Sequence, residues 1–115
     1  MDDVQVSAWK ALPVVEPAPG MARRLISGKQ AMLAWFEFEP GARVPWHRHE
    51  NEQFTYVLQG RLRLRIGEEP EREVVLAAGD VVRIPANVPH EAEALEATVS
   101  LDVFSPPRQD WLPAS

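Results

Sequence analysis

The sequence predicts an all-β protein that folds as a single-domain barrel or sandwich, and three observations lead to this prediction. The chain has 115 residues, a length typical of one domain. Its 11 prolines and 6 glycines interrupt it at short intervals. Between them lie short runs with the residue pattern of strands, and we find no long helical repeat.

The expected elements follow one another in a simple order. Residues 1–20 are expected to form an extended N-terminal arm, because the prolines of "ALPVVEPAPG" exclude a helix interior and Gly20 marks a turn. Residues 21–115 are expected to form the barrel and a C-terminal tail, which is too proline-rich for a helix. Turn signals such as Gly79-Asp80 separate the strand-like runs of the barrel. These runs are 31–40, 53–60, 61–67, 72–80, 81–90 and 97–106.

The run "RLRLRIG" at 61–67 alternates between arginine and apolar residues. Successive side chains of a strand point to opposite faces, so the arginines share one face and the apolar residues share the other. We expect the arginine face to be solvated, with acids such as Glu71 and Glu73 nearby. A basic binding face is the alternative.

Composition excludes several classes of protein. The chain has no cysteine, so it has neither disulfides nor thiolate metal sites. Its net charge of −5 argues against nucleic acid as a partner, because phosphate binding requires a basic surface. No apolar run approaches the roughly 20 residues of a membrane span, and the N-terminus lacks the pattern of a secretory signal, so we expect a cytoplasmic protein without membrane contacts. A small anionic ligand remains compatible with this charge, because one well-placed arginine can bind it.

The chain has three histidines, and two of them, His47 and His49, are two residues apart in an expected strand. Both rings should therefore project from the same face. Gln53 is an even number of residues from both and Glu52 an odd number, so regular strand geometry aims Gln53 inward and Glu52 outward. His90 ends the segment "GDVVRIPANVPH" and is expected in a loop after the strand.

The spacing of these residues resembles the two sequence motifs of the cupin family. Two residues depart from the usual pattern: Gln53 replaces a glutamate, and Asn87 replaces a glycine, although asparagine also tolerates positive φ. The resemblance implies a cupin barrel, which is a double-stranded β-helix or jelly roll. It also implies that one divalent transition metal ion (Ni, Zn, Fe, Mn or Cu) is bound by His47, His49, Gln53 and His90. The first motif is matched by Gly41, His47, His49, Gln53 and Gly60, and the second by Gly79, Pro85 and His90.

These expected ligands, three imidazoles and one amide oxygen, carry no formal charge. A divalent ion held by them keeps its full charge and should be a strong Lewis acid toward substrate oxygens. The set is less suited to a high-valent iron–oxo state than two histidines and a carboxylate. Non-redox chemistry is therefore favoured.

The segment "TVSLDVFSPPRQD" at 98–110 contains a second group of polar residues. Alternation places Asp102 and Phe104 on one side of the expected strand. From the residues alone, a surface strand with an ion pair to Arg108 remains open. In a barrel, an inward Asp102 is a carboxylate available for proton transfer, and Arg108 is the natural clamp for a substrate carboxylate.

The combination of His-x-His, Gln53, "NVPH" and "DVFSPPRQDWL" resembles the KdgF pectin-degradation proteins, which are single-barrel cupins. The resemblance implies metal-dependent ring opening of 4,5-unsaturated monouronates, released by pectin or alginate lyases, to the linear keto form. It implies that Asp102, Phe104 and Arg108 are catalytic. In this mechanism the metal binds the substrate carboxylate and a neighbouring oxygen, Asp102 moves the proton, and Phe104 walls the sugar ring.

Two alternative functions remain. The first is a non-catalytic cupin that binds a sugar or metabolite. The second is a metal-dependent dioxygenase with Glu52 rather than Gln53 as a ligand.

The expected partners are a small anionic sugar and a second copy of the chain. In the homodimer, the arm 1–20 can add a strand to the edge of a partner's sheet. Trp35 and Trp46 are candidate sugar-stacking platforms, but for Trp46 packing on the outside of the sheet or at an interface is the favoured interpretation. Core packing is sufficient to explain Tyr56.

Overall fold

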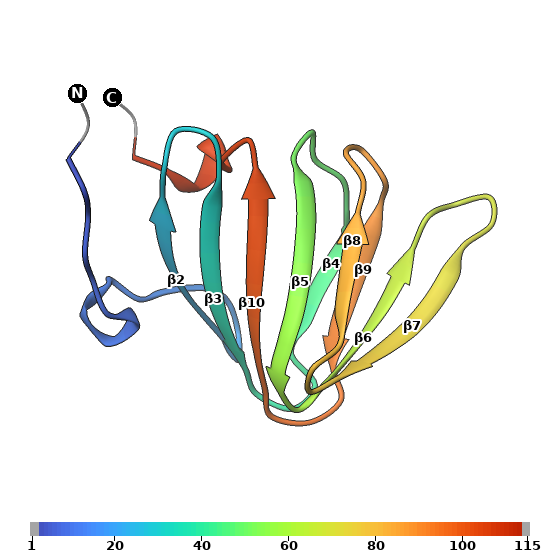
Figure 1. The fold of residues 1–115 in the computed structure, drawn as a ribbon. Helices are drawn as coiled ribbons and strands as arrows, with labels where there is room; N and C mark the ends of the chain where they lie inside the picture. The colour runs from blue at the N-terminus through green and yellow to red at the C-terminus, as the bar shows by residue number, and fades with distance from the viewer. Residues whose placement is uncertain (1–2, 114–115) are drawn as a thin grey trace.

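The computed structural model describes residues 3–113 and has two antiparallel sheets that form a barrel (Figure 1). One sheet has six strands and the other has four. The prediction of an all-β, single-barrel fold is confirmed. No helix within residues 3–113 is long and apolar enough to cross a membrane.

The strand order brings distant parts of the chain together. Strand β10, near the C-terminus, lies between β3 and β5 in the larger sheet, and β9 lies between β4 and β6 in the smaller one. The larger sheet contains, in spatial order, β1 (Val15–Ala18), β2 (Met21–Ser27), β3 (Met32–Phe38), β10 (Thr98–Ser105), β5 (Glu52–Gln59) and β8 (Val81–Ile84). The smaller sheet contains β4 (Arg43–His47), β9 (His90–Ala94), β6 (Arg61–Ile66) and β7 (Arg72–Ala77). Two short 3₁₀ helices, η1 (Trp9–Ala11) and η2 (Gln109–Trp111), lie near the ends of the chain.

Strand β9 was not among the expected strands, and His90 is its first residue rather than part of a loop. Its sequence "HEAEA" contains glutamate and alanine, which are depleted in strands. The strand forms because β4 and β6, on its two sides, pair with its backbone. Glu91 and Glu93 also form ion pairs with arginines of β6. The arginine face of β6 is thus the solvated ion-pair face that the sequence predicts. The pairs are Arg63 with Glu73 and Glu93, and Arg65 with Glu71 and Glu91.

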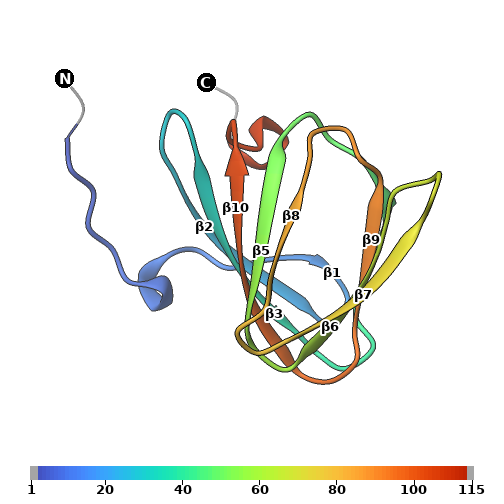
Figure 2. The same ribbon diagram turned by 45° about the vertical axis from the view of Figure 1, so that its right-hand side comes forward.

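The N-terminal arm packs on its own chain (Figure 2). Its β1 pairs with β2, and Arg24 of β2 donates hydrogen bonds to the carbonyls of Trp9, Lys10 and Leu12 at 3.0–3.1 Å. The Trp9 ring packs against that of Trp35, with the ring planes tilted by 33° and a centroid distance of 5.4 Å. The arm therefore supplies a strand to the edge of its own sheet, whereas we expected it to add one to a partner's edge. The expected boundaries 1–20 and 21–115 extend to residues 1–2 and 114–115, which lie outside the described part of the chain.

The core lies between the inner faces of the two sheets, and its residues alternate with outward ones along each strand. The turn after β5 requires glycine, since Gly60 has φ +90° and a Cβ there would overlap Thr98. The largest fully buried apolar residues are Phe104, Met32, Ile84 and Val57.

The outer face of the larger sheet carries several exposed apolar side chains. Tyr56 is one of them, with 41% exposure, so the expectation of core packing is wrong. Its odd spacing from the inward Gln53 places it outside, as strand alternation requires. Trp46, at the end of β4, is also exposed, at 42%. The outward apolar residues of the larger sheet include Leu33, Phe54, Tyr56, Leu58 and Val81, which are 37–60% exposed.

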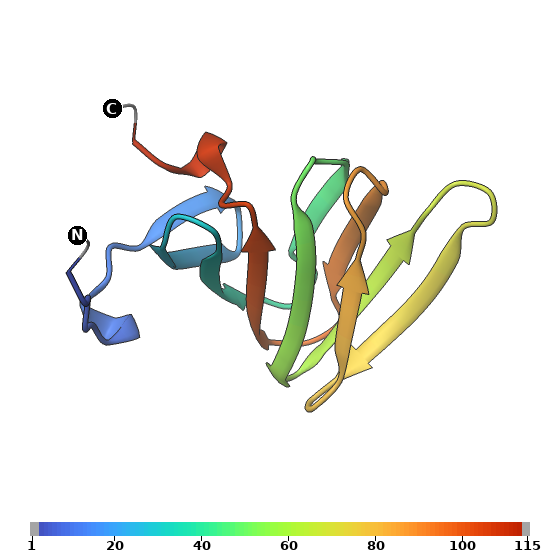
Figure 3. The same cartoon turned by 45° about the horizontal axis from the view of Figure 1, so that its top comes forward.

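One end of the barrel gathers the segments that carry the predicted site. The β4–β5 connection, the β8–β9 connection and the C-terminal tail all lie at this end (Figures 1 and 3). His49 lies in the first of these connections and Arg108 in the tail.

Candidate metal centre and its cavity

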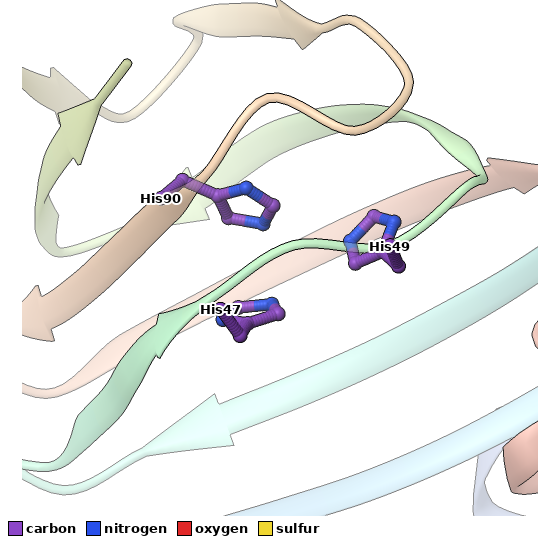
Figure 4. A group of neighbouring side chains, drawn as sticks. All are labelled: His47, His49 and His90. Atoms are coloured by element: carbon purple, nitrogen blue, oxygen red, sulfur yellow. The ribbon is translucent and has the colours of Figure 1, made fainter. Parts of the chain in front are cut away.

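The three histidines lie together although they come from three places in the chain. His47 ends β4, His49 follows it in the connection to β5, and His90 begins β9. Their ligand atoms lie within 4.8 Å of one another, and Figure 4 shows the three rings around a common space. The expectation that His47 and His49 face the same way is confirmed, although β4 ends between them.

Each histidine ring is held by a backbone carbonyl two residues away. The Nδ1 atoms lie 2.7 Å from the Pro45 carbonyl for His47, 3.0 Å from that of Asn51 for His49, and 2.9 Å from that of Val88 for His90. A carbonyl can only accept, so each Nδ1 must carry the proton and donate it. In a neutral ring the lone pair is then on Nε2, which is the arrangement typical of metal-bound histidines.

His90 and His49 are held in the neutral form. Burial is the main cause that lowers the pKa of His90, to about 4. Burial and the Arg108 charge also lower the pKa of His49. The Nε2 of His90 is buried and has no hydrogen-bond partner among the described residues. A buried lone pair without a donor is unfavourable, so it fits a position that accepts a cation.

Gln53 adds a fourth acceptor to this group. Its side chain is 7% exposed, as predicted, and its Nε2 donates to the Thr55 hydroxyl at 2.9 Å. Its Oε1 consequently faces the Nε2 of His49 at 3.0 Å. Two lone pairs at this distance repel each other unless a cation lies beside both. The four side chains therefore fit a divalent metal ion, and the three histidines can hold one; donors of these types do not determine which metal it is.

Glu52, the carboxylate proposed as a ligand in the dioxygenase alternative, lies outside this group. It is half-buried and forms an ion pair with Arg83 on the neighbouring strand β8, at 2.5 Å. The alternation that was expected to aim Gln53 inward and Glu52 outward thus holds despite the bends at residues 50–51.

A cavity of about 240 Å³ opens between the two sheets beside the metal ligands. Its walls include three of the predicted ligands and all three residues that the KdgF resemblance marks as catalytic. The structure therefore brings the two separate groups of predicted site residues into one cavity. These residues are His47, Gln53, His90, Asp102, Phe104 and Arg108.

Asp102 faces inward from β10, so the alternative of a surface strand is wrong. It is 8% exposed, and its Oδ1 has no hydrogen-bond partner within the described chain. Burial raises the pKa of Asp102 to about 7, while the hydroxyl of Thr55, opposite it on β5, and the charge of Arg108 lower this pKa in part. A carboxyl with this pKa is present in both protonation states at neutral pH.

Arg108 forms its ion pair with Asp110 and not with Asp102. Its Nε and Nη2 donate to the two carboxylate oxygens of Asp110 at 3.1 and 2.8 Å. Its guanidinium lies over the rings of Phe104 and Trp111, at 5.3 and 4.2 Å from their centroids. The tail that carries Arg108 and Trp111 is therefore packed against the cavity.

Asn51 is a site residue that sequence analysis missed. It is 4% exposed, and its Nδ2 donates to the carbonyls of Pro106 and Pro107 at 2.6 and 3.2 Å. Its own carbonyl accepts the hydrogen bond from His49. Asn51 therefore connects a metal ligand to the tail that carries Arg108. An asparagine in a polar loop gives no sequence signal of such a role.

Arg23 is a second cavity residue that was missed, because β2 was not among the expected strands. Its side chain is 8% exposed and lines the cavity. Its guanidinium lies 4.2 Å from the centroid of the Trp111 ring. The apolar and polar residues of "MARRLIS" come in pairs and do not alternate, so local periodicity gave no signal for this strand.

Comparisons with known proteins agree with this geometry. The family model for the cupin domain matches residues 34–104. The pectin degradation protein KdgF of Dickeya dadantii (strain 3937) is 31% identical over 103 residues, which are 87% of this chain and 91% of that protein. Bovine 3-hydroxyanthranilate 3,4-dioxygenase is 32% identical over 99 residues, or 85% of this chain. The chain spans about a third of that dioxygenase, 34% of its length.

Solved structures match nearly the whole chain. The structure of KdgF from Halomonas sp. has a TM-score of 0.87 and 27% identity, and the match covers 96% of this chain and all of that one (100%). An RmlC-like cupin from Shewanella frigidimarina NCIMB 400 has a TM-score of 0.87 and 25% identity, over 96% of this chain and 97% of that one. The cupin barrel predicted from the sequence motifs is thus confirmed.

The first testable prediction concerns metal binding. We expect chelator-treated protein to bind one Zn²⁺ or Ni²⁺ per chain, measured by titration calorimetry. Binding should stabilise the fold by about 2.7 kcal/mol when the free metal is about a hundred times its Kd. The His90→Ala variant should lose this binding. The control is Arg48→Ala, because Arg48 is exposed and paired with Glu68. Metal uptake by His90→Ala equal to that of the wild type would contradict the assignment.

The second prediction concerns Asp102 in the metal-free protein. Its pKa in the folded protein, about 7, lies above the unfolded value of about 3.9, so it contributes stability below pH 4 that is lost as pH rises toward 7. Asp102→Asn cannot ionise, so the free energy of unfolding of this variant relative to wild type should rise between pH 4.5 and pH 8, as measured by urea unfolding. Asp110→Asn is the control, because Arg108 lowers the pKa of Asp110 below this window. If the free energy of unfolding of Asp102→Asn differed from that of the wild type by the same amount at pH 4.5 and pH 8, Asp102 would ionise normally.

Proposed function

Since this chain belongs to the cupin family and is a homologue of the pectin-degradation protein KdgF, we propose that it converts 4,5-unsaturated monouronates to their linear keto form. The substrates would be the monosaccharides released by pectin or alginate lyases. The observation that carries the proposal is that Asp102, a buried carboxyl with a pKa near 7, shares one cavity with uncharged metal ligands. A cavity of about 240 Å³ is of a size that suits a monosaccharide.

The metal ligands in this proposal are His47, His49, Gln53 and His90. A divalent ion bound there would act as a Lewis acid that polarises a substrate oxygen. The chain fixes the tautomer of the three histidines, because a backbone carbonyl accepts the proton of each Nδ1 and leaves the lone pair on Nε2. The Thr55 hydroxyl does the same for Gln53, because it fixes which end of the amide faces the site.

Asp102 is proposed to move the proton in the reaction. Ring opening breaks the bond between the anomeric carbon and the ring oxygen, and the proton of the anomeric hydroxyl is transferred to the former ring oxygen, which gives an aldehyde and an enol. A proton then leaves the enol oxygen and another is added to the neighbouring carbon of the double bond, which gives the ketone. A carboxyl with a pKa near 7 can both accept and donate in such a sequence.

Phe104 and Arg108 are proposed to position the sugar. The Phe104 ring is fully buried and lies edge-on to His49, with 5.7 Å between the ring centroids. It offers the sugar ring an apolar wall and excludes water. Arg108 contributes positive charge, which favours anionic sugars over neutral ones.

A metal-dependent dioxygenase is the second candidate, and the similarity to 3-hydroxyanthranilate dioxygenases favours it. The donor set supports the non-redox reaction, because Gln53 occupies the position of a fourth ligand while Glu52 pairs with Arg83. A sugar-binding cupin without turnover is the third candidate, but binding alone does not require a carboxyl with a pKa near 7, such as that of Asp102.

Turnover is tested with unsaturated galacturonate by following the loss of ultraviolet absorbance of its conjugated double bond. The wild type should accelerate this loss over buffer, and Asp102→Asn should keep its metal but lose at least about 100-fold in rate. No acceleration by metal-loaded wild type would reject the proposal. A variant that retains full turnover would remove Asp102 from the mechanism.

Oxygen and metal substitution distinguish the isomerase from the dioxygenase in the same assay. The isomerase should work at an unchanged rate without oxygen and with redox-inert Zn²⁺. A rate that requires oxygen would favour the dioxygenase.

We also propose that two copies of the chain form a homodimer. The apolar outer face of the larger sheet supports this, because Phe54, Tyr56 and Val81 are 39–60% exposed there on neighbouring strands. Sedimentation velocity should find a dimer for the wild type and a monomer for Phe54→Lys. The control is Val75→Lys, since Val75 is equally exposed but lies on β7 of the other sheet. A monomeric wild type would reject the pairing.

A further inference from the structure

Arg23 is a buried guanidinium that forms no ion pair within residues 3–113. It is 8% exposed and lines the same cavity as Asp102 and the metal ligands. Its Nε is buried without a hydrogen-bond partner, and no carboxylate of residues 3–113 forms an ion pair with it. A buried charge is costly unless it is paired, so this position lacks an anion that a ligand can supply.

The other guanidinium of the cavity, that of Arg108, is already engaged. Asp110 accepts hydrogen bonds from its Nε and Nη2, the two donors that form one side of the fork. Both guanidiniums lie 4.2 Å from the centroid of the Trp111 ring, and Asp110 forms its ion pair with that of Arg108. Proximity to Arg108 also contributes to the lowered pKa of Arg23. Arg23 is therefore the arginine whose planar fork is free for a ligand.

The strand register places Arg23 and the metal ligands on opposite sides of Asp102. Arg23 is aligned through Phe36 with Ser100 on β10, whereas Gln53 is aligned with Phe104 on the same strand. Asp102 stands between Ser100 and Phe104, with its side chain on the same inner face. On the inner face of the larger sheet, Asp102 thus lies between Arg23 on one side and Gln53 on the other.

We infer that Arg23 is a specificity-determining residue that receives the substrate carboxylate, a role that the sequence analysis assigned to Arg108 and the metal. The inference rests on the proposed function for the nature of the substrate, an unsaturated uronate. With its carboxylate on Arg23, the adjacent double bond comes to Asp102, which must protonate it. The hydroxyl-bearing end of the sugar is then directed toward His47, Gln53 and His90. Arg108, held by Asp110, adds positive charge and packs the tail over the cavity.

The test uses binding, so that it does not depend on turnover. The zinc-loaded protein is titrated calorimetrically with galacturonate and with galactose, which differ by the carboxylate. The wild type should bind galacturonate more tightly than galactose. Arg23→Gln should lose at least about tenfold in affinity for galacturonate and keep its affinity for galactose. Arg83→Gln is the matched control, because Arg83 is an exposed arginine of the same sheet, paired with Glu52.

The possible outcomes separate this inference from the proposed function. A wild type that fails to turn over unsaturated galacturonate, but prefers galacturonate through Arg23, would reject the proposed function and support the inference. Equal wild-type affinity for the two sugars, or an unchanged preference in Arg23→Gln, would overturn the inference even if turnover is observed. If Arg23→Gln does not fold, Arg23→Lys keeps the charge without the fork. It should lose about tenfold in galacturonate affinity, and wild-type affinity in this variant would overturn the inference.

Discussion

The chemistry of this protein depends on one constraint, which is that three buried or half-buried imidazoles donate their Nδ1 protons to backbone carbonyls. Each of these carbonyls is two residues from its histidine, so the chain fixes the tautomer locally. The three Nε2 atoms then converge as acceptors, and the amide oxygen of Gln53 joins them because its nitrogen is bonded to Thr55. An uncharged group of acceptors around a common space is stable only with a cation present or with water supplying protons. This arrangement can hold a metal ion, and an ion bound there would act as a Lewis acid.

The charge of the cavity is opposite to that of the whole chain. The protein carries a net charge of −5, and its acids pair with arginines on the outer faces of the sheets. In the cavity, Asp102 is the one acidic residue of the described lining, and burial raises its pKa to about 7. Arg23 and Arg108 stand in the same wall. The two arginines therefore give the cavity a positive charge that the net charge of the chain does not show.

The open end of the barrel is assembled by contacts between segments far apart in the sequence. Asn51 links the connection that carries His49 to the tail through Pro106 and Pro107. Trp111 of the tail packs edge-on against Phe104, at 5.1 Å between centroids. A shift of the tail would therefore move a ligand loop, a wall of the cavity and Arg108 together. This coupling explains why a short proline-rich tail, with only one turn of 3₁₀ helix, belongs to the site.

The sequence by itself determined the features that depend on local periodicity and spacing. Strand alternation is a property of neighbouring residues, so it correctly placed Gln53 inside and Glu52 outside. It also placed Asp102 and Phe104 on one side of their strand, but only the barrel decided that this side faces inward. The motif spacing likewise predicted the cupin barrel and the histidine cluster. Only the tertiary structure decided what depends on distant partners: that the weak strand former "HEAEA" is held between β4 and β6, that Arg108 pairs with Asp110, and that Arg23 enters the cavity. The physical reason is that pairing energy and burial come from neighbours brought together by the strand order, and no local pattern contains that order.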